Sequence, residues 1–239
     1  MHRYIHAPLL AATLSLCACG DADQSPATAS SATGATAHNA LASCLLAFKA
    51  DPCQLLDDAV VQQLGTPGEA ELERSASDYG DGECSVSWLG GRTRQIDLGG
   101  RTMESPQADM LSVGGFAVID EDPELAAQRF AAQTRTRSDA ERQQLGDQVV
   151  AGVKKTDSID DKHQQMAQDF ARDLASKINF TPVEGLGDAA AWGGLGRFKQ
   201  LQVRVGHMKF HTSAQIADDD AANLAVARQL AEQVLDRCQ

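Results

Sequence analysis

The positions of the cysteines constrain this chain more than any other feature of its sequence. Of the six cysteines, Cys17 and Cys19 close an apolar N-terminal segment, and the other four are Cys44, Cys53, Cys84 and Cys238. Four cysteines in an oxidising compartment can form two disulfides in three ways. We favour Cys53–Cys84 with Cys44–Cys238, because the second bridge would join the two ends of the folded region. The alternative pair Cys44–Cys53 would close only a local turn.

The N-terminal segment has the features of an export signal. Arg3 is followed by an apolar run from Pro8 to Leu16, which is far shorter than the roughly 20 residues of a membrane-spanning helix. Residues 1–18 are therefore predicted to be a signal peptide. Leu16-Cys17-Ala18-Cys19 resembles the lipobox of bacterial lipoproteins, with a small alanine before the modified cysteine. Cys19 is the predicted lipidation site.

The segment after Cys19 indicates where the protein is held. An N-terminal lipid would anchor the chain in the bacterial envelope, on the periplasmic face. Gly20, in place of an aspartate, favours the outer membrane over the inner one. Residues 19–38 are small and polar, and are predicted to form a flexible tether. The alternative is a soluble secreted protein cut near Ala18.

Residues 39–239 are long enough for one domain with a sizeable core. The chain has a net charge of −12, and removal of Arg3 with the signal would make it about −13. An acidic domain of this kind is unsuited to binding nucleic acid or anionic lipid. It is compatible with a basic protein partner.

Helical periodicity dominates the domain. Helices are predicted from Asp51-Pro52 to Gly65 and from Asp122-Pro123, where aspartate supplies the N-cap and proline the first turn. A third helix is predicted from about Ser158 to Ile178. A final helix is predicted from the aspartates at 218–220 to about Asp236.

Strand patterns are fewer. Cys84–Trp88 alternates apolar residues with serines, and Arg94–Leu98 is predicted to return as its partner. Leu201–Val205 and Met208–Ile216 are predicted to form a hairpin around Gly206, which the final helix follows. The sequence therefore predicts a single α+β domain, in which helices cover an antiparallel sheet and a β-hairpin precedes the C-terminal helix.

One motif suggests nucleotide chemistry. Gly185-Leu-Gly187-Asp188-Ala-Ala has the letters of a dinucleotide fingerprint. That function needs a helix directly after the motif, and the glycine-rich residues 192–196 do not favour one. We therefore predict that Gly185, Gly187 and Asp188 form a structural loop that leads into a strand, with Asp188 bonding the amides of its own loop. No cofactor is predicted.

No metal site or catalytic set is predicted either. His207 and His211 would lie about 13 Å apart on a strand, too far apart to hold one ion. The acidic segments 78–83 and 157–161 lack EF-hand spacing, and the aspartates at 218–220 fit a helix N-terminus. No Gly-x-Ser-x-Gly elbow is present, and pairing would leave no cysteine as a nucleophile. The protein is expected not to be an enzyme.

Several motifs together resemble a class of small exported bacterial lipoproteins of unknown function, best known from actinobacteria. The motifs are Cys53-Gln-Leu-Leu before Gly65, Cys84 before Trp88, and Val183-Glu-Gly-Leu-Gly-Asp-Ala-Ala-Ala-Trp192 before a hairpin and a closing helix. The resemblance implies a compact α+β domain with one sheet and a Cys53–Cys84 disulfide. It implies no activity.

The expected function is therefore binding. We expect a membrane-anchored periplasmic lipoprotein that binds another protein, most specifically an immunity-type inhibitor of a basic antibacterial effector or toxin. The alternative is a small-ligand or lipid-binding sensor or carrier. That alternative predicts an apolar cavity between the sheet and the helices.

Overall fold

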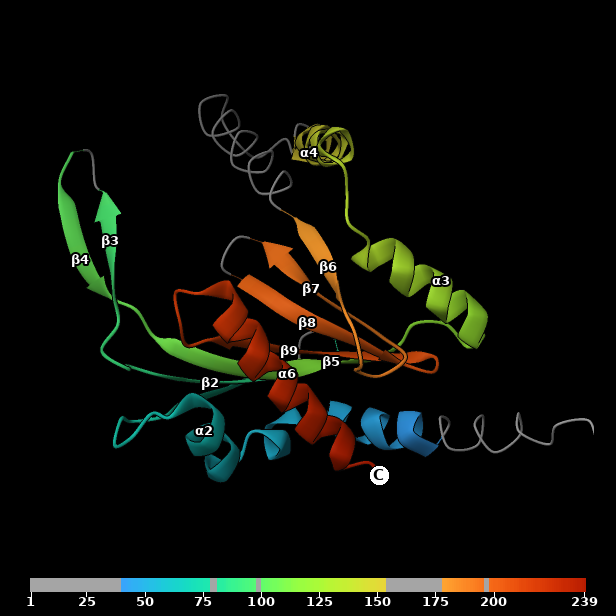
Figure 1. The fold of residues 1–239 in the computed structure, drawn as a ribbon, viewed down its shortest axis with the longest axis horizontal. Helices are drawn as coiled ribbons and strands as arrows, with labels where there is room; N and C mark the ends of the chain where they lie inside the picture. Colours follow the sequence, from blue (N-terminus) through green and yellow to red (C-terminus); the bar gives the residue numbers. More distant parts are fainter. Residues whose placement is uncertain (1–39, 78–80, 98–99, 154–177, 196–197) are drawn as a thin grey trace, which may run out of the picture.

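The computed structural model describes residues 40–77, 81–97, 100–153, 178–195 and 198–239. These residues form a seven-stranded sheet with helices packed on it, which confirms the predicted α+β class (Figure 1). In chain order the elements are a helix over 40–47, η1 (Phe48–Ala50), η2 (Pro52–Leu55), α2 (Asp58–Gly65), β1 (Glu73–Ser77), β2 (Glu83–Trp88), β3 (Thr93–Asp97), β4 (Thr102–Pro106), β5 (Asp109–Val118), α3 (Pro123–Thr134), α4 (Asp139–Val153), β6 (Asn179–Val183), β7 (Ala189–Leu195), β8 (Phe198–Val205), β9 (Met208–Gln215) and α6 (Asp220–Asp236).

The sheet is antiparallel throughout, with strand order β1-β2-β5-β9-β8-β7-β6. Among the described strands, β3 and β4 pair only with each other. They form a two-stranded ribbon, called the arm below, that rises from one end of the sheet (Figure 1). The arm continues the line of β2 and β5, the strands that precede and follow it along the chain.

The arm corrects one prediction from the sequence. Residues 94–98 were expected to pair with Cys84–Trp88, but β2 pairs with β1 and β5 instead. The chain does not reverse after Trp88. The Gln107 N–H donates to the Arg92 carbonyl at 2.9 Å, and pairing then resumes at Thr93 and Pro106. β2 therefore runs onward into the arm, and the chain turns only at its tip.

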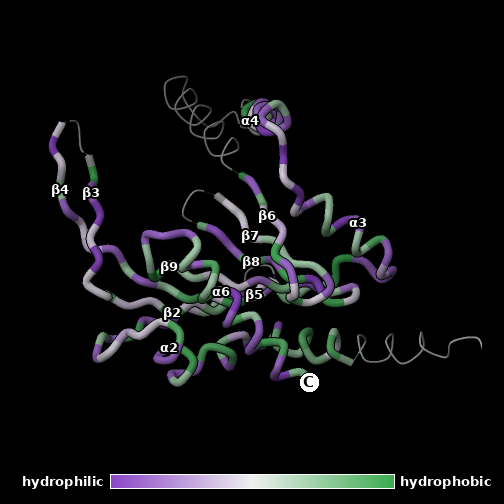
Figure 2. The backbone as a smooth tube through the Cα atoms, in the orientation of Figure 1, coloured by the Kyte–Doolittle hydropathy of each residue, from purple (hydrophilic) through white to green (hydrophobic). Residues whose placement is uncertain are grey.

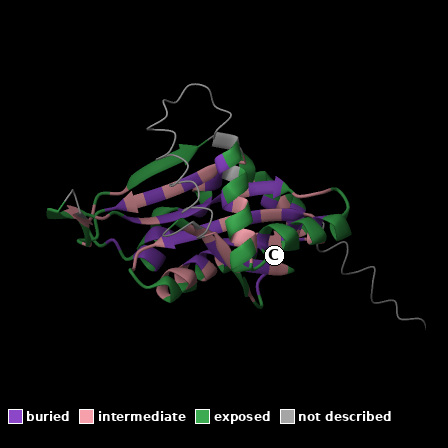
Figure 3. Cartoon of the chain, turned by 90° about the horizontal axis from the view of Figure 1, so that it is seen from above, coloured by how far each residue is buried: buried purple, intermediate pink, exposed green. Residues whose placement is uncertain are grey.

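One face of the sheet carries the hydrophobic core. In β8 and β9, which pair as the predicted hairpin, Leu201, Val203 and Phe210 are fully buried on this face. Helix α6 covers it, and the Thr212 hydroxyl donates to the Ala227 carbonyl of α6 at 2.7 Å. Figure 3 shows the buried positions concentrated along the strands of the sheet. The C-terminal helix is thus both packed and hydrogen-bonded onto the sheet.

The helices lie on both sides of the sheet. η1, η2, α2 and α6 contact the core side, whereas α3 contacts β6 and β8 and lies across the sheet from α6 (Figure 1). Aspartates accept hydrogen bonds from the first-turn amides of three helices, α2 (Asp57), α3 (Asp122) and α6 (Asp219). The Asp122-Pro123 start was predicted. These caps satisfy amides that have no partner within the helix.

The predicted start at Asp51-Pro52 is wrong for the α-helix. These residues open the 3-10 helix η2, and the Asp51 side chain makes no capping bond. The α-helix begins only at Asp58, although it ends at Gly65 as predicted. The reason is the disulfide from Cys53 in η2 to Cys84 in β2, which ties this turn of chain to the sheet before the helix starts.

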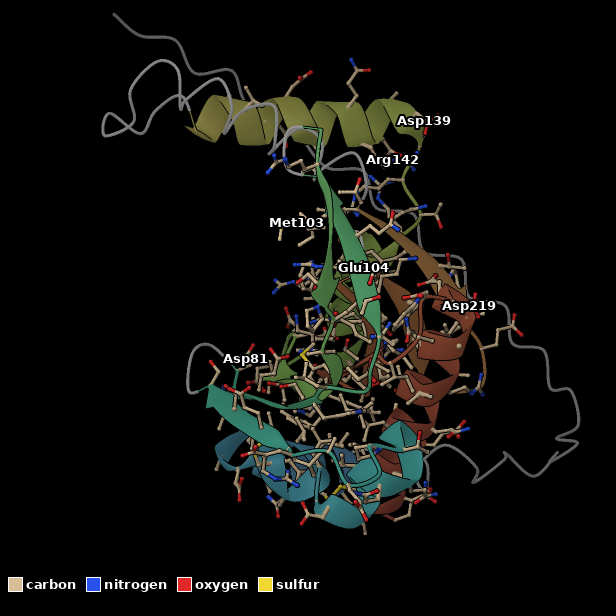
Figure 4. The ribbon with its side chains drawn as sticks, turned by 90° about the vertical axis from the view of Figure 1, so that its left-hand side faces the viewer. Asp81, Met103, Glu104, Asp139, Arg142 and Asp219 are labelled. Carbon is tan, nitrogen blue, oxygen red and sulfur yellow. A yellow bond between two sulfur atoms is a disulfide. The ribbon has the colours of Figure 1, made fainter. Side chains whose placement is uncertain are left out.

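Two disulfides join cysteines of the described residues, and they are the two pairs favoured from the sequence. Cys44 is bonded to Cys238 across 194 residues, and Cys53 to Cys84 across 31. Cys44 lies in the helix over 40–47 and Cys53 in η2, within the layer of helices drawn in blue and teal in Figure 4. In the chain-entropy model, loops of these lengths correspond to about 5 and about 4 kcal/mol of stabilisation. One disulfide therefore joins the helix over 40–47 to the C-terminal end of the chain, and the other joins η2 to β2.

Three predictions fall outside the described residues. They are the signal peptide at 1–18 with the tether at 19–38, the lipidation site Cys19, and most of the helix from Ser158 to Ile178. Among the helices that the structure describes, none is both long and apolar enough to cross a membrane.

Candidate functional site

A nearly buried ion pair fixes the base of the arm. Arg92 contacts Asp109 through Nε, and their side chains are only 18% and 9% exposed. The same guanidinium donates from Nη2 to the Gln215 carbonyl at 2.7 Å and from Nη1 to Asp218 at 3.1 Å. One side chain therefore connects the arm to β5, to the end of β9 and to the chain leading into α6. The arm is held in a defined direction where it leaves the sheet.

Two grooves flank this base. The outer groove is a cavity of about 590 Å³ lined by Ala70, Glu71, Leu72, Glu73, Ser87, Trp88, Leu89 and Ala108. The inner groove is a cavity of about 300 Å³ lined by Ser87, Arg94, Pro106, Gln107, Ala108, Met110, Phe198 and Gln215. The two share Ser87 and Ala108, so they are neighbours on either side of the chain that enters the arm.

Large apolar side chains are exposed around the arm. Leu89 in the outer groove is 65% exposed, Phe198 in the inner groove 56%, and Met103 on the arm 55%. Met103 pairs directly with Ile96 across the ribbon, and Figure 4 shows its side chain projecting from the arm. The rest of the arm is mostly hydrophilic (Figure 2). Single exposed apolar residues are ordinary, but three around one projecting element indicate a contact surface.

A second group of polar side chains lies on the sheet face opposite the core. Nε2 of His211 in β9 is 3.9 Å from Oε1 of Glu83 in β2, and has no hydrogen-bond partner among the described residues. The imidazole and, more weakly, the Ser112 hydroxyl hold the pKa of Glu83 below its usual value, although partial burial opposes them. The three residues come from the adjacent strands β2, β5 and β9.

A glycine bulge makes room for this histidine. The pairing of β5 with β9 shifts between Gly114 and Ala117. Gly115 has a φ of +67°, and a Cβ at this position would lie 2.4 Å from Nδ1 of His211. β-Bulges often re-aim a side chain beside a functional site. Here the missing side chain at Gly115 lets the imidazole approach the backbone of β5 closely.

The order of these groups is not that of a hydrolytic triad. A catalytic serine gives its proton to an imidazole, which a carboxylate orients from the other side. Here Ser112 and His211 both lower the pKa of the Glu83 carboxyl. Among the described residues, no hydrogen bond joins Ser112 to His211. The arrangement is a histidine–carboxylate pair on the sheet face opposite the core.

The predicted loop at Gly185, Gly187 and Asp188 leads directly into β7, as expected for a structural loop. Both glycines have positive φ, and a Cβ on Gly187 would lie 2.5 Å from the Arg204 carbonyl. Asp188 was expected to bond the amides of its own loop. Its carboxylate accepts from the Gly206 N–H at 2.6 Å, which joins the loop to the β8–β9 turn.

His207 and the aspartates at 218–220, which were considered as metal ligands, lie in a turn and at the start of a helix. His207 lies in the turn before β9 and not on the strand, so the predicted strand spacing to His211 does not apply. Asp219 caps α6, while Asp220 accepts from Lys199 and from Trp192. Within the part of the chain that is described, no group of three or more His, Cys, Asp or Glu side chains is placed to hold a metal ion.

The arm and its base were missed from the sequence. A signal for them exists: the glycine pairs 90–91 and 99–100 bracket a short polar segment, a pattern typical of a hairpin. Comparison of the chain with family models, curated proteins and solved structures finds no match.

Proposed function

We propose that this protein is a membrane-anchored periplasmic lipoprotein that binds another protein through the arm and the grooves at its base. In its most specific form, it is an immunity-type inhibitor of an antibacterial effector and has no enzymatic activity of its own. The observation that carries the proposal is the arm, a ribbon that pairs with no other described strand and has exposed apolar residues around it.

The rigid base of the arm supports this role. A projecting hairpin that moved freely would lose conformational entropy on binding, which weakens affinity. Arg92 limits that motion because it is bonded to Asp109, Asp218 and the Gln215 carbonyl at once. The surface offered by Leu89, Met103 and Phe198 is therefore preorganised.

Charge supports a basic partner. The whole chain has a net charge of −12, and an excess of one sign accelerates encounter with a partner of the other sign. The outer groove adds two carboxylates, Glu71 and Glu73, beside its apolar residues. An incoming basic effector fits this distribution.

The alternative, a small-ligand or lipid carrier, is less well supported. It calls for an apolar cavity between the sheet and the helices, where the structure has a cluster of buried residues that includes Leu111, Phe116 and Leu230. The outer groove has a volume in the range of small-molecule sites, but it lies beside the arm and includes two glutamates. Its lining suits a polypeptide with charged side chains better than an acyl chain.

Photo-crosslinking in the source cells tests the proposal. A photoreactive amino acid replaces Met103 in the full chain, and a matched variant carries it at the exposed Gln128 of α3. We expect a discrete protein adduct from position 103 that position 128 does not give. Absence of a protein adduct at position 103, or the same adducts at both positions, would contradict the proposal.

Shortening the arm tests whether it is required. Thr93 and Pro106 are paired, so residues 94–105 can be replaced by Asn-Gly, the dipeptide preferred in tight hairpin turns. For the immunity role, cells that lack the protein should become sensitive to their kin. The intact chain should restore resistance and the shortened chain should not, at equal envelope levels. Restoration by the shortened chain would rule out the arm as the binding element.

The anchor is tested separately. Cys19→Ser should release the protein from the membrane fraction, and mass spectrometry of the unaltered protein should show a lipid on Cys19. An unmodified Cys19 thiol in that protein would refute the anchoring.

A further inference from the structure

We propose that the outer groove binds one arginine side chain of the partner protein, together with an apolar residue next to it in the partner's sequence. This inference rests on the proposed protein-binding function. It assigns the groove to one occupant, an arginine presented on a loop of a basic partner.

The groove lies beside the base of the arm, on the β2 side of β1. Residues 70–73 form one wall, and residues 87–89 with Ala108 form the other. Glu73 and Ser87 are directly paired, so the two walls are joined by the first pair of the β1–β2 ladder. The volume of about 590 Å³ is in the range of small-molecule sites. It leaves room for a long side chain and for part of the residue next to it.

Two carboxylates of the groove lack a counter-charge among the described residues. Glu71 and Glu73 are exposed and make no hydrogen bond or ion pair with any residue that the structure describes. The next residue, Arg74, donates to the Leu56 carbonyl and contacts Asp58, so its charge is engaged elsewhere. The described lining of the groove includes no lysine, arginine or histidine. The groove therefore favours a cationic group of the partner over an anionic one.

The groove also offers apolar surface beside these carboxylates. Leu89 is 65% exposed, Leu72 is half-buried, and the buried Trp88 lines the same cavity. The stem of a long cationic side chain can lie along such a surface while its charged end reaches the carboxylates. An apolar residue beside it would be stabilised roughly in proportion to the area removed from water. The cavity and its apolar wall, and not the carboxylates alone, therefore define the ligand as cationic and amphipathic.

Arginine suits this combination better than lysine. The planar guanidinium has five donors and can bond two carboxylates at once, whereas the lysine ammonium is a compact and strongly hydrated charge. Arginine is also enriched among the residues that contribute most to protein–protein binding. A second copy of this chain is a poor source of the arginine, because each copy has a net charge of −12. The occupant is therefore assigned to a basic partner protein.

Model peptides test this assignment on the full chain, purified in detergent at about 0.15 M salt, where weak surface attraction is screened. The probe is a small cyclic peptide that presents leucine-arginine in a tight turn. One twin has citrulline in place of arginine, which keeps the shape of the side chain and removes its charge. A second twin has lysine. Binding is followed by the backbone amide NMR signals of residues 70–73 and 87–89.

We expect saturable binding of the arginine peptide, with shifts confined to those residues. It should bind about fivefold more tightly than the citrulline twin, and more tightly than the lysine twin. The double change Glu71→Gln with Glu73→Gln should abolish the preference for arginine over citrulline. The matched change Glu121→Gln with Glu124→Gln, at exposed sites near the start of α3, should leave that preference unchanged. Leu89→Ser should weaken the binding of both peptides.

A preference for arginine that persists in the Glu71→Gln, Glu73→Gln protein would overturn the inference, as would equal binding of the arginine peptide and either twin. Its failure can be separated from that of the proposed function. If the arm crosslinks a partner in cells and the arginine peptide does not bind the groove, protein binding stands and this assignment falls.

Discussion

The Asp109 carboxylate lies against the Arg92 guanidinium beneath the arm, and both side chains are almost excluded from solvent. A charge in such a place is costly unless its partner stays with it. Arg92 also reaches Gln215 and Asp218, so the pair joins parts of the chain that are far apart in sequence. The direction of the arm therefore depends on a contact below it.

Removal of the Asp109 carboxylate should lower the free energy of unfolding. Asp109→Ala leaves the buried Arg92 without its main counter-charge, and we expect a loss of about 3 kcal/mol in the free energy of unfolding. Asp218→Asn is the matched control, because Asp218 is 86% exposed and should cost under about 1 kcal/mol. Urea unfolding of the three proteins measures both effects, and equal losses would contradict the assigned role.

A methyl group at Gly65 should disturb Trp88. A Cβ on Gly65 would lie 2.3 Å from Cη2 of the indole, which is itself buried. We expect Gly65→Ala to cost about 1–3 kcal/mol, as overpacked cores do, and to change the tryptophan fluorescence. Gln62→Ala, at an exposed site on the same helix, should change stability by less than about 0.5 kcal/mol. An unchanged Gly65→Ala protein would show that the indole moves freely.

The pKa of the Glu83 carboxyl should lie below its ordinary value of 4.5, because His211 and then Ser112 favour its charged form. Since the folded pKa lies below the unfolded one, its contribution to stability is present above about pH 4.5 and is lost as the pH falls through the folded pKa. In carboxyl NMR titrations, His211→Ala should move the midpoint up towards 4.5. The stability difference between the unaltered protein and Glu83→Gln should shrink in acid. A midpoint unaffected by His211→Ala would refute the coupling.

Each of the two disulfides should stabilise the fold independently of the other. Cys44→Ser with Cys238→Ser, and Cys53→Ser with Cys84→Ser, should each lower the free energy of unfolding by about 2–5 kcal/mol. The second pair should cost more than its shorter loop implies, because Cys84 is fully buried and a serine there adds an unsatisfied hydroxyl. Chemical denaturation of both double variants measures this, and a cost confined to one pair would contradict it.

Local signals predicted some elements of the fold well. Asp122-Pro123 marked a helix start, Gly206 marked the turn of the β8–β9 hairpin, and the aspartates at 218–220 marked the last helix. Each depends on backbone chemistry within a few residues. Such signals can be recognised in one sequence because they do not depend on contacts between distant residues.

Other elements depend on contacts that the sequence does not display. β5 is an inner strand of ten residues, yet Gly114 and Gly115 interrupt its alternation, and their bulge is explained only once His211 lies beside it. β1 is polar throughout and is defined by its pairing with β2. The candidate site was missed for the same reason, since Arg92 becomes notable only when folding brings Asp109 and Gln215 to it.

The bond between Cys44 and Cys238 has a mechanical consequence. Traction on the N-terminal end of the chain reaches Cys44 within the helix over 40–47 and passes there to Cys238, two residues after the end of α6. Peeling of the chain from that end must stop at the sulfur bridge, because further unravelling would require α6 to leave the sheet as well. The domain can thus bear load between its N-terminal end and the sheet that carries the arm.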